Sequence, residues 1–103
     1  MKKIFCLTII LLLTVSFCFA GEYSFVPKNG FVPDEKTAIA IAEAVWAPIY
    51  GEKKITNEKP FKAKLKDGMW TVEGSLPKLY VGGVAVAEIS QKDGCILSIS
   101  HGK

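Results

Sequence analysis

Few residues in this chain have side chains that could support catalysis or hold a metal ion. The chain of 103 residues has one histidine, His101, and two of its three cysteines, Cys6 and Cys18, lie in an apolar N-terminal segment. His101 and Cys95 together cannot supply the usual ligand set of a structural zinc site. As a nucleophile and its base they would need to touch, but on one strand they lie roughly 20 Å apart. The sequence therefore predicts neither a metal site nor a cysteine nucleophile.

The remaining polar residues form no recognisable catalytic pattern. The serines of the C-terminal half lack the flanking glycines of a nucleophile elbow. Gly82-Gly83 is not followed by the lysine and helix of a phosphate-binding loop. Asp67 and Asp93 each precede a glycine, where a carboxylate stabilises a turn. The sequence predicts no cofactor and argues against an enzyme.

The first twenty residues are typical of a secretory signal peptide. Two lysines follow Met1, residues 4–15 are uncharged, and the small residues Cys18 and Ala20 stand at positions −3 and −1 of a cut before Gly21. The uncharged run is short for a membrane span. We expect cleavage between Ala20 and Gly21 and a domain that works in the periplasm or outside the cell. The alternative is an uncleaved anchor, which would be the protein's only contact with the membrane.

The composition of residues 21–103 excludes one broad class of partner. This part has eleven lysines, ten acidic residues and no arginine, so its net charge is close to +1. Nucleic-acid binding usually needs a concentrated positive field and bidentate arginine contacts, so we expect no nucleic-acid partner. Six of the lysines lie between residues 53 and 66. They indicate a solvated strand face and turn or, alternatively, a surface for an acidic partner.

The N-terminal part of the domain is expected to be one helix. Residues 21–33 show no periodicity and are predicted to form an extended lead-in whose aromatic side chains pack beneath the domain. Asp34 is a suitable N-cap for a helix over about 35–47. Pro48 disfavours helical geometry in the residue before it, and Gly51 can supply the closing conformation with positive φ.

This helix is unusually apolar. One stripe follows helical spacing and is expected to face a sheet: Ile39, Ala42, Val45 with Trp46, and Ile49. Ala38, Ile41 and Ala44 lie partly off the stripe and are also apolar. The helix is therefore either wrapped by its own sheet or in contact with another protein.

Two hairpins follow a polar loop over residues 52–59. The first turns at Asp67-Gly68, since both positions of the favoured two-residue turn need positive φ. The predicted pairs on its buried face are Leu65 with Trp70 and Ala63 with Val72, while Lys62 and Lys64 point the other way. The second is predicted to turn through the three residues 92–94, with Asp93 in the turn and a left-handed Gly94. That register pairs Ile89 with Leu97, Ala87 with Ile99 and Glu88 with Ser98.

These elements predict an α+β fold, with one main N-terminal helix packed on a curled four-stranded antiparallel sheet made of two hairpins. Residues 30–103 also resemble a family of bacterial immunity proteins with a nuclear-transport-factor-2-like (cystatin-like) fold. The resemblance rests on Pro33-Asp34 before the alanine-rich helix, on PFKAKLKDGMWTVEGSLP over 60–77, on Asp93-Gly94 with Ile96-Leu97, and on the final His101-Gly102-Lys103. It implies a protein that is encoded beside a toxin and that binds and blocks this toxin.

The resemblance and the signal peptide together imply an exported immunity protein against a toxin that acts outside the cytoplasm. The alternatives are a secreted peptidase inhibitor or modulator of the peptidase-propeptide type and a structural envelope domain. The expected partner is a protein, with a homodimer possible. The residues proposed to bind the partner are two aromatic anchors and two steering lysines: Trp46, Tyr50, Lys62 and Lys64.

Overall fold

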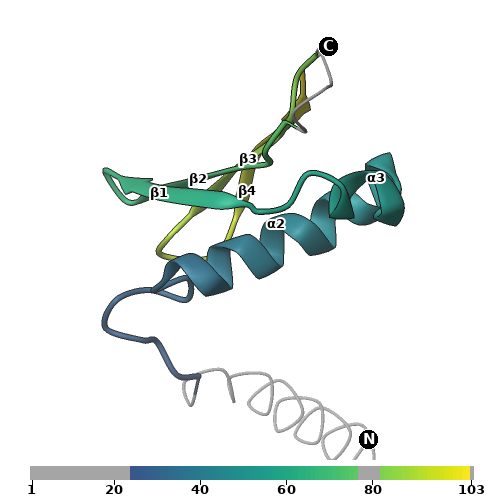
Figure 1. Ribbon diagram of the computed structural model, residues 1–103. Coiled ribbons are helices and arrows are strands. Elements are labelled where there is room, and N and C mark those ends of the chain that lie inside the picture. The colour runs from purple at the N-terminus through teal and green to yellow at the C-terminus, as the bar shows by residue number, and fades with distance from the viewer. Residues whose placement is uncertain (1–23, 77–81, 103) are drawn as a thin grey trace, which may run out of the picture.

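The structure, a computed structural model, describes residues 24–76 and 82–102 and consists of a long helix packed on one face of a curled antiparallel sheet (Figure 1). The elements are α2 (Glu35–Tyr50), α3 (Glu52–Thr56), β1 (Lys62–Lys66), β2 (Met69–Glu73), β3 (Ala85–Ser90) and β4 (Ile96–His101). The strands lie in the order β1-β2-β3-β4. This confirms the predicted α+β fold. The proposed signal peptide and its cleavage site at Ala20 and Gly21 lie outside the described residues.

The start of α2 is the one that the sequence predicts. Asp34 has extended backbone geometry, and its Oδ1 accepts a hydrogen bond of 2.8 Å from the Thr37 N–H. Hydrogen bonds from the Thr37 side chain and backbone hold the pKa of the Asp34 carboxyl below its ordinary value. Glu35 follows in the first turn, where the helix dipole favours an acid.

The predicted end of this helix was wrong. The helix continues through Pro48 to Tyr50, and Gly51, with φ 101°, donates its N–H to the Ala47 carbonyl at 2.9 Å. Proline has a φ that suits a helix, and the cost of its missing N–H is local. Tyr50 packs against the core, so tertiary contacts hold the last turn in place.

The buried face of α2 is also rotated from the predicted stripe. Ala38, Ala42 and Trp46 are fully buried, whereas Ile49 is 56% exposed. These three residues follow an i, i+4 spacing, and the two alanines let the helix approach the sheet closely. The polar loop predicted over 52–59 contains α3 instead, whose Ile55 is 1% exposed.

The first hairpin is confirmed in every predicted pair. Asp67 and Gly68 have φ of 51° and 76°. Leu65 lies opposite Trp70 and Ala63 opposite Val72, and Lys64 and Lys62 lie opposite Thr71 and Glu73.

The second hairpin is confirmed in part. Gly94 has the expected positive φ of 76°, and Asp93 Oδ1 accepts from the Cys95 N–H at 2.9 Å, which lowers the pKa of the Asp93 carboxyl. The predicted pairs of Ala87 with Ile99 and Glu88 with Ser98 are present, but Ile89 lies opposite Ile96 rather than Leu97. The Ser90 N–H bonds to the Cys95 carbonyl at 2.9 Å, so the loop has four residues and a bulge in β4 takes up the extra residue.

The aromatic side chains of the lead-in do not pack beneath the domain as predicted. Phe25 and Phe31 are 77% and 50% exposed, whereas Val32 is buried. The N–H groups of Phe31 and Val32 bond to the carbonyls of Lys92 and Gln91, both at 3.0 Å. This pairing turns Val32 inward, and its carbonyl accepts a 2.7 Å hydrogen bond from the buried Trp70 Nε1.

Candidate functional site

A buried carboxylate at one end of the sheet is the feature that the sequence analysis missed. Glu58, expected in a polar loop, is 6% exposed. Its Oε1 accepts from the Ala85 N–H at 2.7 Å, and its Oε2 lies 2.8 Å from His101 Nε2. Because a buried charge needs a partner, these contacts make Glu58 and His101 one unit.

The hydrogen bonds of His101 define how this pair holds its proton. His101 Nδ1 lies 2.7 Å from the Gly102 carbonyl oxygen, which can only accept, so Nδ1 carries a hydrogen. Nε2 then either donates to the Glu58 carboxylate or accepts from the protonated acid. Both ring nitrogens are engaged in either case. A general base needs a free nitrogen within reach of its substrate, and this geometry offers none.

The pair joins segments that are distant in the sequence. Glu58 follows α3, Ala85 begins β3 and His101 ends β4. A Cβ built on Gly74, just after β2, would lie 2.5 Å from Glu58 Oε1, so only glycine leaves room for the carboxylate. The Tyr50 ring lies beside the imidazole, with ring centroids 5.1 Å apart. The Glu58–His101 pair is thus a structural link between the end of α2, α3 and three strands.

Cys95 takes no part in this unit. It is exposed at the start of the last hairpin strand, and His101 bonds to Glu58 and Gly102 instead. Within residues 24–76 and 82–102, no cluster of histidine, cysteine and acidic side chains could hold a metal ion. In the same part of the chain, no helix has the length and hydropathy needed to cross a membrane.

The prediction that Trp46 binds a partner was wrong. It is fully buried, its ring packs edge-on against Phe61 with centroids 5.4 Å apart, and its Nε1 donates to the Val86 carbonyl at 3.4 Å. Its position in the buried i, i+4 row of α2 explains this burial. Trp46 therefore stabilises the core and is not exposed to a partner.

The other three proposed partner-binding residues do not lie together. Tyr50 is half-buried against the core on the α2 side of the sheet. Lys62 and Lys64 are exposed and alternate with Ala63, which faces the core, so they lie on the opposite side. We call this outward side of β1, formed by Lys62, Lys64 and Lys66, the lysine face. Among the described residues, the two ion pairs are Lys59 with Glu43 and His101 with Glu58, so these three lysines are unpaired.

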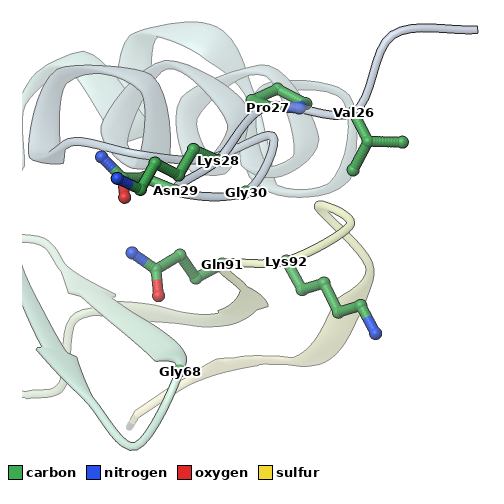
Figure 2. A pocket seen from close by; sticks show the side chains of 8 residues that line it. All are labelled: Val26, Pro27, Lys28, Asn29, Gly30, Gly68, Gln91 and Lys92. Atoms are coloured by element: carbon green, nitrogen blue, oxygen red, sulfur yellow. The ribbon is translucent and has the colours of Figure 1, made fainter.

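A shallow cleft of about 480 Å³ separates the lead-in from the turns of both hairpins (Figure 2). Its lining includes Lys28, Asn29, Gln91 and Lys92. Figure 2 shows the side chain of Lys92 extending away from the lead-in, so the two lysines do not converge on one point. The cleft contains no acidic side chain and offers no catalytic group.

Residues 37–103 match the sequence profile of a family described as "NTF2 fold immunity protein". The matched region runs from the first turn of α2 to the end of the chain. The chain is also similar to "Uncharacterized protein YbbC" of Escherichia coli (strain K12), with 40% identity over 73 residues. The aligned part is 70% of this chain and 60% of that relative, so it spans about three fifths of the relative's length. No solved structure matches the chain.

Proposed function

Because the chain belongs to the NTF2 fold immunity protein family, we propose that it binds and neutralises one cognate bacterial toxin outside the cytoplasm and catalyses no reaction. The observation that carries this proposal is the family match, which includes all but the first two residues of α2 and all four strands. The buried Glu58–His101 pair supports it, because both ring nitrogens of the histidine are already bonded within the protein.

The lysine face is the proposed site of first contact with the toxin. Lys62, Lys64 and Lys66 are exposed on an edge strand, and no acidic side chain of the described residues pairs with them. Such a row of unpaired charges accelerates the approach of an oppositely charged protein. We therefore expect the toxin surface that docks here to be acidic.

Binding and protection can be tested together with the product of the neighbouring gene. We expect this product to be toxic, to be captured by the protein, and to lose its toxicity when both are produced in one cell. Reversing Lys62 and Lys64 to glutamate should lower the association rate at low salt by about tenfold or more. The matched control reverses Lys53 and Lys54, which are exposed on α3, and should change the rate far less.

Two outcomes would contradict parts of this proposal. If no neighbouring product binds and deletion sensitises no cell to a toxin, the immunity role is wrong and a peptidase modulator becomes the better hypothesis. If both pairs of charge reversals slow association equally, the protein still binds its toxin but the lysine face is not the contact.

Export is tested by the mass and location of the native protein. The lysines, uncharged run and small residues of the first twenty positions support cleavage between Ala20 and Gly21. We expect a product that begins at Gly21 and is found outside the cytoplasm. An intact N-terminus in the cytosolic fraction would contradict export, and with it a toxin that acts outside the cytoplasm.

A further inference from the structure

Both nitrogens of the His101 ring face groups that accept hydrogen bonds. Nδ1 lies 2.7 Å from the Gly102 carbonyl oxygen, and Nε2 lies 2.8 Å from Glu58 Oε2. A carbonyl oxygen can only accept, and a carboxyl group can donate only when it is protonated. A neutral imidazole has a single N–H, so it cannot bond to both a carbonyl and an ionised carboxylate. The observed contacts therefore require one hydrogen on Nδ1 and a second hydrogen between Nε2 and Oε2.

This second hydrogen has no substitute at the site. Glu58 Oε1 is already bonded to the Ala85 N–H at 2.7 Å, and the side chains of Glu58 and His101 are 7% and 15% exposed. If the hydrogen leaves to water as a proton, the lone pair of Nε2 faces a carboxylate oxygen. Alternatively, the remaining hydrogen moves to Nε2 and the bond to Gly102 is lost. In either case one of the two hydrogen bonds of the ring is broken where water has little access, which is costly.

The other charged groups of the described residues do not take over the role of this proton. α2 presents the Tyr50 ring to the imidazole, with centroids 5.1 Å apart, and a phenol is uncharged near neutral pH. Glu73 of β2 and Glu88 of β3 lie on the side of the sheet that carries the lysine face, away from α2. Lys59 is paired with Glu43 of α2 at 3.4 Å, and the charged residues of α3 are exposed. Within residues 24–76 and 82–102, the ion pairs place no third charge on the Glu58–His101 pair.

We propose that the Glu58–His101 pair is a pH-sensitive link that holds the C-terminal end of β4 closed only while it carries the shared proton. The 3.2 Å bond from the Gly102 N–H to the Val84 carbonyl lies next to this link in the chain and is held by it. Histidine in an unfolded chain loses its charge between about pH 5 and pH 8, whereas the folded pair retains its proton to satisfy both contacts. The folded protein then binds one more proton than the unfolded chain, so its stability falls as the pH rises. At high pH the proton passes to water and the end of β4 separates from β3.

The first test is chemical unfolding from about pH 6 to about pH 8.5, the range in which histidine changes its charge. The protein is expressed from the full sequence, purified in the form that the cell produces, and kept reduced. Its unfolding equilibrium constant should rise with pH, by at most about tenfold per pH unit, which is the limit for one linked proton. An indicator dye should also record proton release when the protein unfolds in a weak buffer near the upper end of this range.

The matched variant is Glu58→Gln, which completes the same contacts without the extra proton. Its amide oxygen can accept from the Ala85 N–H, and its NH₂ group can donate to Nε2 of a neutral ring whose Nδ1 still donates to Gly102. The unfolding constant of this variant should therefore stay level or fall as the pH rises. A second variant, His101→Gln, can donate to the ionised carboxylate and has no ring to titrate, so its constant should stay level.

The local part of the proposal is tested by amide hydrogen exchange at Gly102. After correction for the intrinsic effect of pH on exchange, the protection of the Gly102 N–H should fall with pH in the wild type and stay constant in Glu58→Gln. A wild-type unfolding constant that is level over the whole range overturns the proposal, as does an equal rise in Glu58→Gln and His101→Gln. A wild type that loses stability with pH but keeps its protection at Gly102 shows that the proton does not control the end of β4. None of these results depends on whether the protein binds a toxin.

Discussion

Replacing His101 with alanine should leave Oε2 of the buried Glu58 side chain without its hydrogen-bond partner. In the wild type, Oε1 bonds to the Ala85 N–H and Oε2 to His101 Nε2, at 2.7 and 2.8 Å. The substitution leaves Oε2 without a partner in a side chain that is about 7% exposed. It also removes the contact between the imidazole and the Tyr50 ring.

The expected loss follows from this burial. For the ionised form of the pair, removal of one partner costs about 3–5 kcal/mol, because the remaining charge stays desolvated. The His101 side chain is 15% exposed, so some water reaches the site and the lower part of that range applies. We expect the free energy of unfolding of His101→Ala to fall by about 3 kcal/mol at neutral pH. In a domain of this size, this lowers the melting temperature by roughly 12–24 °C.

The assay is chemical unfolding followed by tryptophan fluorescence, with Glu58→Gln as the matched variant. Glutamine can still accept from the Ala85 N–H and can donate to a neutral His101 Nε2, so this change alone should cost under about 1 kcal/mol. In the Glu58→Gln background, His101→Ala leaves no buried charge behind. The double-mutant cycle should therefore show a coupling of about 1–3 kcal/mol. A loss below about 1 kcal/mol for His101→Ala alone, or a cycle without coupling, would refute the reasoning.

Three further predictions concern single elements of the fold. Trp70→Ala should lower the free energy of unfolding by about 3–5 kcal/mol, as measured by denaturant titration. Trp70→Phe should lower it by less in the same assay, because phenylalanine keeps most of the packing and removes only the hydrogen-bond donor of the Val32 carbonyl. Gly94→Val should lower the free energy of unfolding by about 1–3 kcal/mol, because a β-branched residue resists the φ of 76° at this position. Gly94→Asn should lower it much less, since asparagine tolerates this conformation. Equal melting temperatures of the two variants would contradict the left-handed conformation of residue 94. The stability contributed by the ionised Asp34 is complete above the ordinary pKa of 3.8 and is lost as the pH falls through its lower folded pKa. Asp34→Asn, which still caps the helix, should remove this acid dependence from the melting temperature.

The sequence predicted the parts of the fold that local rules determine. The Asp67-Gly68 turn fixes the register of the first hairpin, because the turn type and the alternation of apolar residues agree. Asp34 marks the start of α2 through an equally local contact, because its side chain bonds to the N–H of Thr37, three residues along the chain. Each signal lies within a few residues of the structure that it specifies.

The sequence-based predictions were wrong where a local conformational preference competes with tertiary contacts, or where it allows two different conformations. Pro48 favours an end to α2, but the contacts of Tyr50 with the core hold one more turn. In the second hairpin, one extra residue can be placed in the turn or in the strand. Hydrophobic pattern could not choose between these, because Ile96 and Leu97 are both largely exposed on the free edge. The bulge in β4 is thus a consequence of an edge that no other strand constrains.

The candidate site was the least predictable feature, for a related reason. Glu58 and His101 are separated by 43 residues, and neither belongs to a sequence motif that indicates which residue it contacts. Gly74, whose missing side chain makes room for the carboxylate, also looks like an ordinary strand-end glycine in the sequence. Only the closure of the sheet brings these three positions together.

The placement of the polar groups agrees with the proposed binding role. Glu58, which is the buried acid among the described residues, and His101 bond to each other and to the backbone, and these hydrogen bonds hold the ends of β3 and β4 together. This fixes the C-terminal end of the edge strand β4, while the lysines of β1 at the opposite edge remain exposed. The sheet is therefore anchored at its centre by the packing of α2 and at one end by the Glu58–His101 pair. Its two edges differ in charge, because β1 carries three exposed lysines and β4 has no charged residue from Ile96 to Ser100.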